Sequence, residues 1–211
     1  MRSPDRVSAI LMGSGFSRRF GGENKLLVPF RGKPLARHTL ELVCGLNKDP
    51  NGGDSPFFCN IFFITADEQT DAIAAGLPVT LIRNGAPQNG RRESVRLGLE
   101  AADKLKNRPD YYFFFPCDQP LLDTETVRLI MAARQSGKIV EPCFHGEADS
   151  LAYGSPSLFS AAFREELLSL EEGEQPNVIK ARHPNALIKV EIANPLALID
   201  IDTPEDIEKY S

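Results

Sequence analysis

The sequence contains few of the residues that build metal centres or disulfide frameworks. Its 211 residues include four cysteines and three histidines, and no two cysteines form a Cys-x-x-Cys pair. The cysteines are Cys44, Cys59, Cys117 and Cys143, and the histidines, which do not cluster with them, are His38, His145 and His183. This spacing argues against a zinc site or a disulfide framework. Buried free thiols in a reducing compartment are the simpler interpretation.

Long apolar runs and an excess of positive charge are also absent. No segment is apolar over the length that a bilayer requires, and the short N-terminal apolar run stops at a glycine loop, unlike a secretory signal. Lys and Arg total 24 against 29 Asp and Glu, which gives a formal net charge of -5. Such a chain has no general attraction to nucleic acid or to anionic membranes. We therefore expect a cytoplasmic protein that binds neither, and any phosphate binding must be local.

The chain does contain a glycine-rich loop, but it lacks the two best-known phosphate-binding patterns. After Gly13 and Gly15, Arg18 stands where the dinucleotide fingerprint needs a third glycine, and no Gly-Lys-Ser or Gly-Lys-Thr closes a P-loop. The loop follows a short apolar run, residues 7–12, that predicts a buried strand. The loop combines its glycines with two cationic residues, Arg19 and Lys25, within a short stretch of sequence. Exposed backbone N–H groups with fixed cations favour a polyphosphate site over a solvated surface loop.

The stretch from Gly15 to Leu27 resembles a known family. Gly-Phe-Ser-Arg-Arg-Phe-Gly followed by Asn-Lys-Leu-Leu is similar to the signature of nucleotidyltransferases related to molybdenum-cofactor cytidylyltransferase. The sequence departs from that signature at its start, where Met12, Gly13 and Ser14 replace Leu-Ala-Ala or Leu-Ala-Gly. The same stretch helps to select the nucleotide base in the family. The departure therefore bears on base specificity more than on fold.

Strand and helix patterns alternate along the rest of the chain, which predicts one domain over residues 1–211. We expect a mainly parallel, mixed sheet with helices on both faces, a Rossmann-like nucleotidyltransferase fold. The expected strands are 7–12, 57–65, 79–83, 111–116, 139–144, 149–153, 187–192 and 197–201. The expected helices are 34–43, 67–75, 94–105, 124–135, 157–170, 177–182 and one capped by Thr203. Ligands of such sheets bind outside the carboxyl ends of the strands.

Two acidic positions are candidate metal ligands. Asp118 follows an apolar strand, where an ionised carboxylate is costly unless it is paired, and Asp118-Gln119-Pro120 is similar to the family's metal motif in its cytidylyltransferase version. A turn-forming aspartate is the alternative. Asp202 lies within an Asp-Ile-Asp-Thr-Pro-Glu-Asp segment, residues 200–206, like the family's, although the same pattern is an ordinary strand-to-helix junction. One or two carboxylates with phosphate oxygens suit Mg²⁺.

Further residues are assigned through the resemblance. Asn84, Gly90 and Ser94 fit the spacing of the family's second loop, which contacts base and ribose, although Ser94 is equally placed to cap a helix. Gly154 and Pro156 resemble its acceptor-side Gly-x-Pro. The predicted nucleotide site is completed by Gly13, Ser14, Gly15, Ser17, Arg19 and Lys25.

The resemblance implies transfer of CMP from CTP to the phosphate of molybdopterin cofactor, with Mg²⁺ and release of pyrophosphate. Its product would serve a molybdenum hydroxylase. Arg19, Lys25 and Asp118 would be catalytic, because an ionised phosphate nucleophile needs alignment and charge neutralisation rather than a general base. Three alternatives stay open. They are a guanylyltransferase on the same cofactor, a sugar- or polyol-phosphate nucleotidyltransferase, and a non-catalytic accessory protein that binds nucleotide or cofactor.

Overall fold

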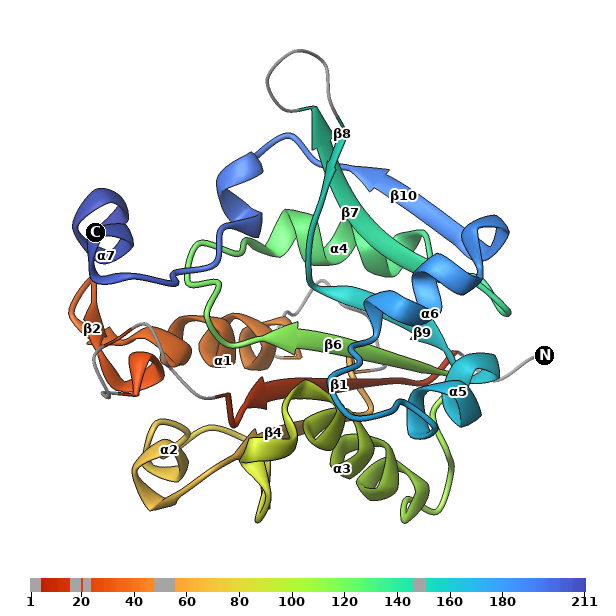
Figure 1. Ribbon diagram of the computed structural model, residues 1–211, viewed down its shortest axis with the longest axis horizontal. Coiled ribbons are helices and arrows are strands. Elements are labelled where there is room, and N and C mark those ends of the chain that lie inside the picture. The colour runs from red at the N-terminus through yellow and green to blue at the C-terminus, as the bar shows by residue number, and fades with distance from the viewer. Residues whose placement is uncertain (1–4, 16–19, 21–23, 48–55, 146–150) are drawn as a thin grey trace.

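A mixed eight-stranded sheet occupies the centre of the molecule (Figure 1). The computed structural model describes residues 5–15, 20, 24–47, 56–145 and 151–211. Seven strands lie in the order β10-β7-β9-β6-β1-β4-β5, and β8 pairs with β7. Their bounds are β1 (Val7–Gly13), β4 (Asn60–Thr65), β5 (Thr80–Arg83), β6 (Tyr111–Pro116), β7 (Ile139–His145), β8 (Leu151–Tyr153), β9 (Ser157–Ser160) and β10 (Leu187–Glu191). A separate hairpin pairs β2 (Pro29–Phe30) with β3 (Lys33–Pro34).

The central part of the sheet is parallel. β1 pairs in parallel with both β4 and β6, and β4 with β5. β9 runs antiparallel between β6 and β7, whereas β10 is parallel to β7. The carboxyl ends of β1, β4 and β6 therefore meet at one edge. The expected mainly parallel, mixed sheet is confirmed.

Helices cover both faces of this sheet because its central strands are apolar on both sides (Figure 1). Leu11 and Phe113 face a core that includes residues of α1 and α4, whereas Ile10 and Phe114 face one that includes residues of α3 and α5. Gly98 lets α3 approach β1, since a Cβ there would lie 2.6 Å from the Ile10 side chain. The helices are α1 (Leu35–Leu46), α2 (Glu68–Ala72), α3 (Arg91–Asp103), α4 (Thr124–Ala132), α5 (Arg164–Leu168), α6 (Asn177–Arg182) and α7 (Pro204–Tyr210).

Two predicted elements were wrong in type. Residues 157–170 were expected to form one helix, but residues 157–160 are strand β9, followed by a 3-10 turn and α5. The burial of β9 between two strands determines this result, and a short apolar run does not reveal its neighbours. Residues 197–201 were expected to form a strand, but Pro195–Leu198 is a 3-10 helix whose first turn is capped by Asn194.

The C-terminal helix begins as predicted. Thr203 accepts a hydrogen bond from the backbone N–H of Asp206, and the Asp206 carboxylate accepts one from the backbone N–H of Thr203, which completes a capping box. Pro204 occupies the first helical position. Of the helices in the described ranges, none has both the length and the apolar character that a membrane span requires.

Candidate active site

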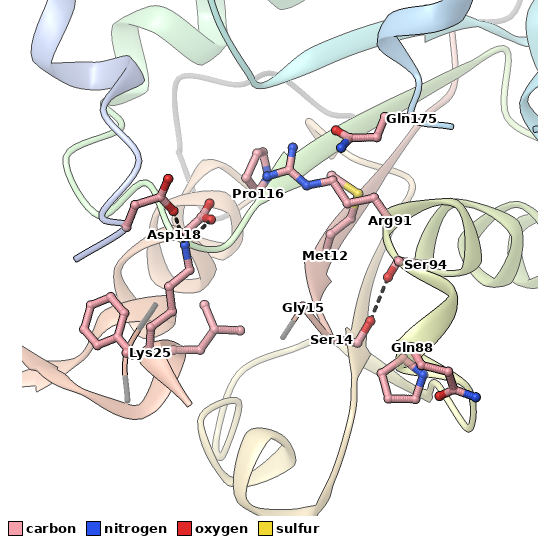
Figure 2. Close-up of a pocket in the computed structure, with 15 residues that line it drawn as sticks. Met12, Ser14, Gly15, Lys25, Gln88, Arg91, Ser94, Pro116, Asp118 and Gln175 are labelled. Atoms are coloured by element: carbon pink, nitrogen blue, oxygen red, sulfur yellow. Dashed lines mark hydrogen bonds and ion pairs between the residues drawn. The ribbon is translucent and has the colours of Figure 1, made fainter. Parts of the chain in front are cut away.

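A cavity of about 440 Å³ opens at the carboxyl ends of β1 and β6, where Met12 and Pro116 line it. The loop after β1 forms one part of its wall, and the turn that leads into α3 forms another (Figure 2). Seven residues that the sequence predicted as site residues line this cavity: Ser14, Gly15, Lys25, Gly90, Ser94, Asp118 and Asp202. The prediction that the glycine loop and Asp118 meet at the carboxyl ends of the strands is therefore confirmed.

Lys25 lies at the centre of the charged part of the site. Its Nζ donates hydrogen bonds to Oδ2 of Asp118 at 2.8 Å, to Oδ1 of Asp202 at 2.8 Å and to the carbonyl oxygen of Ile201 at 3.0 Å. Burial by itself would lower the pKa of Lys25, but the charges and hydrogen bonds of the two aspartates outweigh burial and raise the pKa above its ordinary value. The ammonium group therefore stays charged throughout the neutral range.

The C-terminal segment is attached to the end of β6. The backbone N–H of Ile201 donates to the carbonyl oxygen of Asp118 at 2.9 Å. Nε2 of the buried Gln119 donates to the carbonyl oxygen of Leu198 at 3.2 Å. These two contacts place Asp202 beside Lys25, although residues 199–202 are not part of the sheet. Gln119 therefore helps to hold the C-terminal segment in place without lining the cavity.

Asp118 has the features of a metal ligand. Its Oδ1 is buried and has no hydrogen-bond partner among the residues that the structure describes, while its Oδ2 accepts a hydrogen bond from Lys25. The pKa of Asp200, a residue that is exposed to solvent, is raised to about 6. Partial desolvation of its carboxylate by the surrounding protein is the main cause, and the negative charge of Asp118 adds to it. The charges of Arg91 and Lys25 oppose the rise. A divalent cation would supply the missing partner and relieve the repulsion. Residues 5–15, 20, 24–47, 56–145 and 151–211 contain no cluster of three or more His, Cys, Asp or Glu residues able to hold a metal. The donor set instead matches Mg²⁺, which takes one or two carboxylates and fills its remaining positions with phosphate and water oxygens.

Ser14 joins the two nucleotide-binding loops predicted from the sequence. Its Oγ lies 2.7 Å from Oγ of Ser94 and accepts a hydrogen bond from Nδ2 of Asn84 at 2.9 Å. Oδ1 of Asn84 accepts from the backbone N–H of Ala86, which fixes the amide orientation. All three side chains of the network are buried. Asn84 thus supports the site without lining the cavity, whereas Ser14 and Ser94 reach it.

Several predicted site residues lie elsewhere. Gly13 ends β1 and does not line the cavity; a Cβ there would overlap the Phe63 ring and lie 3.1 Å from the Ile64 carbonyl oxygen, so packing requires a glycine. Gly154 and Pro156 lie between β8 and β9 and do not line the cavity either. Ser17 and Arg19 lie outside the described residues.

Several cavity residues were not among the site residues predicted from the sequence, and three of them are polar: Gln88, Arg91 and Gln175. Arg91 and Gln175 both line the cavity, and Figure 2 shows them on the side away from Lys25. Arg91 was left outside the expected helix, which was predicted to begin at residue 94, whereas α3 begins at Arg91. Gly90, directly before Arg91, could have indicated the start of the helix in the sequence. It lies at the cap position of α3 with a φ of 74°, a backbone conformation that favours glycine.

The sequence and the fold resemble those of known proteins. A molybdenum cofactor guanylyltransferase from Shewanella sp. strain ANA-3 is 25% identical over 213 residues, with 98% of this chain and 95% of that protein covered. A solved nucleotidyl transferase from Methanothermobacter superposes with a TM-score of 0.76 at 18% identity, covering 97% and 95% of the two chains. A Mycobacterium tuberculosis protein solved as a complex with manganese superposes with a TM-score of 0.68 at 18% identity, covering 97% of each chain.

The family assignment follows from a direct sequence match. The profile of the MobA-like NTP transferase domain matches residues 9–186, which is most of the chain. The matched range begins in β1 and includes the glycine loop, Lys25, the turn before α3 and Asp118. This protein therefore belongs to the MobA-like NTP transferase family and is a nucleotidyltransferase by family.

Proposed function

We propose that this protein transfers CMP from CTP to the phosphate of molybdopterin cofactor and releases pyrophosphate. The observation that carries the proposal is the cluster of Lys25, Asp118 and Asp202 on the wall of a cavity that the glycine loop also lines. The curated relatives named molybdenum cofactor guanylyltransferase support this acceptor, because their similarity extends over nearly the whole chain. The product would be passed to a molybdenum hydroxylase in the cytoplasm.

The reaction brings two anions together, so the residues must neutralise and align them. A phosphate oxygen of the acceptor forms a bond to the α-phosphorus while the bond from that phosphorus to the bridging oxygen breaks. Pyrophosphate leaves with the electron pair. The acceptor phosphate has a second pKa of about 6 and is already ionised, so no residue need remove a proton. In this scheme Lys25 stabilises the charge that grows at the α-phosphate, and Arg19 with the loop amides holds the outer phosphates.

Mg²⁺ fits the site through Asp118, whose buried Oδ1 has no partner within the described part of the chain, and through Asp202, which contacts the same lysine. When bound, the ion supplies a Lewis acid that neutralises phosphate charge and orients the reacting oxygens. Lys25 now bridges the same two carboxylates at 2.8 Å each. The ammonium thus offsets part of the negative charge of the two aspartates before nucleotide and metal bind.

The nucleotide base has two candidates. Asp118-Gln119-Pro120, similar to the cytidylyltransferase version of the metal motif, supports CTP. The second candidate is GTP, which the names of the curated relatives favour together with the departure at Met12, Gly13 and Ser14. The buried contacts of Ser14 with Ser94 and Asn84 supply a physical reason why that departure bears on the base. On the acceptor side, Gly154 and Pro156, which lie between β8 and β9 and outside the cavity lining, are proposed to contact the part of the cofactor that extends out of the cavity.

The test is pyrophosphate release from CTP, GTP, ATP and UTP, each offered separately with Mg²⁺ and molybdopterin cofactor. Release with CTP alone is the expected result, and release with GTP alone would replace the cytidylyl proposal by the guanylyl one. Turnover with a sugar or polyol phosphate but not with the cofactor would identify a different acceptor. Nucleotide or cofactor binding without turnover on any acceptor would indicate an accessory protein.

A further inference from the structure

Arg91 places a second positive charge in the cavity. It is the first residue of α3, it is exposed to solvent, and it lines the cavity together with Gln175 (Figure 2). Its guanidinium makes no hydrogen bond or ion pair with any residue that the structure describes. The protein scaffold therefore does not occupy the five N–H donors of this side chain.

Lys25, the other cation of the described cavity lining, is already engaged. An ammonium group has three N–H donors, and those of Lys25 have acceptors in Asp118, Asp202 and the carbonyl of Ile201. One ammonium between two carboxylates leaves a net negative charge in that part of the site. Lys25 cannot neutralise a second incoming anion there, so the anionic acceptor needs a cation elsewhere.

The position of Arg91 suits the attacking group rather than the leaving group. Figure 2 shows Lys25 and Asp118 on one side of the cavity and Arg91 with Gln175 on the other. Attack on phosphorus proceeds with the attacking and leaving oxygens roughly in line. If pyrophosphate leaves on the side of Lys25, the nucleophile must arrive from the opposite side.

We propose that Arg91 binds the phosphate monoester of the acceptor and aligns it with the α-phosphate of the nucleotide. This inference rests on the proposed function, because it assumes an acceptor that attacks through a phosphate. A planar guanidinium matches two phosphate oxygens at once, which fixes direction as well as charge. Gln175, on the same side of the cavity, adds a neutral amide that can donate to one of these two oxygens, which leaves the third oxygen free to attack.

The experiment compares Arg91→Ala, Arg91→Lys and a matched control, Arg92→Ala. Arg92 is the neighbouring residue on α3, but it does not line the cavity, and its guanidinium donates to the carbonyl oxygen of Leu170 at 3.3 Å. Thermal unfolding first checks that each variant folds. Initial rates are then measured against acceptor concentration at saturating nucleotide, and nucleotide Kd is measured separately by calorimetry.

We expect Arg91→Ala to raise the KM for the acceptor about 10- to 100-fold, the range for losing hydrogen bonds to a charged group. The nucleotide Kd should stay within about twofold, because in the proposal Arg91 does not touch the nucleotide phosphates. The acceptor KM of Arg91→Lys should lie between those of the native protein and Arg91→Ala, since a lysine keeps the charge but not the two parallel hydrogen bonds. Arg92→Ala should resemble the native protein. A weakened nucleotide Kd with an unchanged acceptor KM would overturn the assignment.

A binding measurement separates this inference from the proposed function. Equilibrium dialysis with the acceptor and with its dephosphorylated form gives the contribution of the phosphate without any turnover. Arg91→Ala should abolish most of the preference for the phosphorylated form. If the native protein turns over but the variant retains the full preference, only the role of Arg91 fails. If the native protein shows neither turnover nor any preference for the phosphorylated form, both proposals fail.

Discussion

Lys25 and Asp118, 93 positions apart in the chain, are joined by a hydrogen bond of 2.8 Å. The contact exists because β1 and β6 are adjacent parallel strands, so the segments that follow them emerge at the same edge of the sheet. Asp202, 177 positions from Lys25, is held by the same ammonium group at 2.8 Å. Three distant segments thus meet at one charged cluster on the cavity wall.

Asp118→Asn should remove most of the increase in the rate of pyrophosphate release that a divalent cation produces. The substitution keeps the size of the side chain but removes the charge that would hold the ion, and the loss of one stabilising group of this kind costs about 100-fold or more in turnover. The measurement is the rate of pyrophosphate release across a Mg²⁺ titration. Asp123→Asn is the matched control, because Asp123 caps α4 outside the cavity and asparagine caps as well as aspartate. A Mg²⁺ response of native size in Asp118→Asn would contradict the metal assignment.

Ser14→Ala should destabilise the fold by about 1–3 kcal/mol, the cost of leaving a buried polar group without its partner. The substitution takes away the acceptor of Asn84 Nδ2 and the neighbour of Ser94 Oγ. Urea unfolding measures the difference in the free energy of unfolding. The exposed Ser136, substituted by alanine, should shift stability by less than about 0.5 kcal/mol. An unchanged urea midpoint for Ser14→Ala would mean that the network is not coupled to folding.

Lys180→Met should be strongly destabilising. The ammonium of Lys180 lies 2.8 Å from Oε2 of Glu141 and 2.7 Å from Oγ of Ser157, and the two charged side chains are only 11% and 7% exposed. Removing one partner of a buried ion pair leaves the other charge unpaired and costs about 3–5 kcal/mol. The double variant Lys180→Met, Glu141→Leu should recover much of this loss. Denaturant unfolding of all three proteins provides the test, and a neutral single variant would refute the predicted coupling.

The stability of the protein should fall as the pH is lowered from about 7 to about 5, in part through His38. Burial lowers the pKa of His38 below its ordinary value of about 6.5, although the hydrogen bond of Nε2 with the carbonyl of Phe30 opposes the shift. The unfolded chain therefore takes up the proton at a higher pH than the folded protein does. The stability that neutral His38 provides is fully present above the unfolded pKa and is lost as the pH falls toward the folded pKa.

His38→Gln keeps an N–H donor but does not titrate, so it isolates this contribution. The measurement is the free energy of unfolding of both proteins at several pH values in that window. The native protein should lose more stability than His38→Gln between about pH 7 and pH 5. Parallel curves would show that the folded and unfolded pKa values of His38 are equal.

Much of the architecture follows from patterns that are local in the sequence. The buried apolar runs of β1 and β6 alternate along the chain with segments that have a helical pattern, which predicts a parallel sheet. Ligands of such a sheet bind at the carboxyl ends of its strands. Lys25 and Asp118 could therefore be brought together before any coordinates were known. The strand β9 could not be recognised, because its four residues become a strand only by pairing with β6 and β7.

The sequence by itself determined the α/β class, the glycine loop and the acidic residues of the site, because periodicity, glycine spacing and charge are properties of neighbouring residues. The tertiary structure alone decided that Ser14 contacts Ser94 and Asn84, that Gly13 is required by packing, and that Arg91 faces the cavity. Each of these depends on distances between segments that the chain brings together only on folding. A side chain's partners in space are fixed by strand order and helix boundaries, which local patterns leave open.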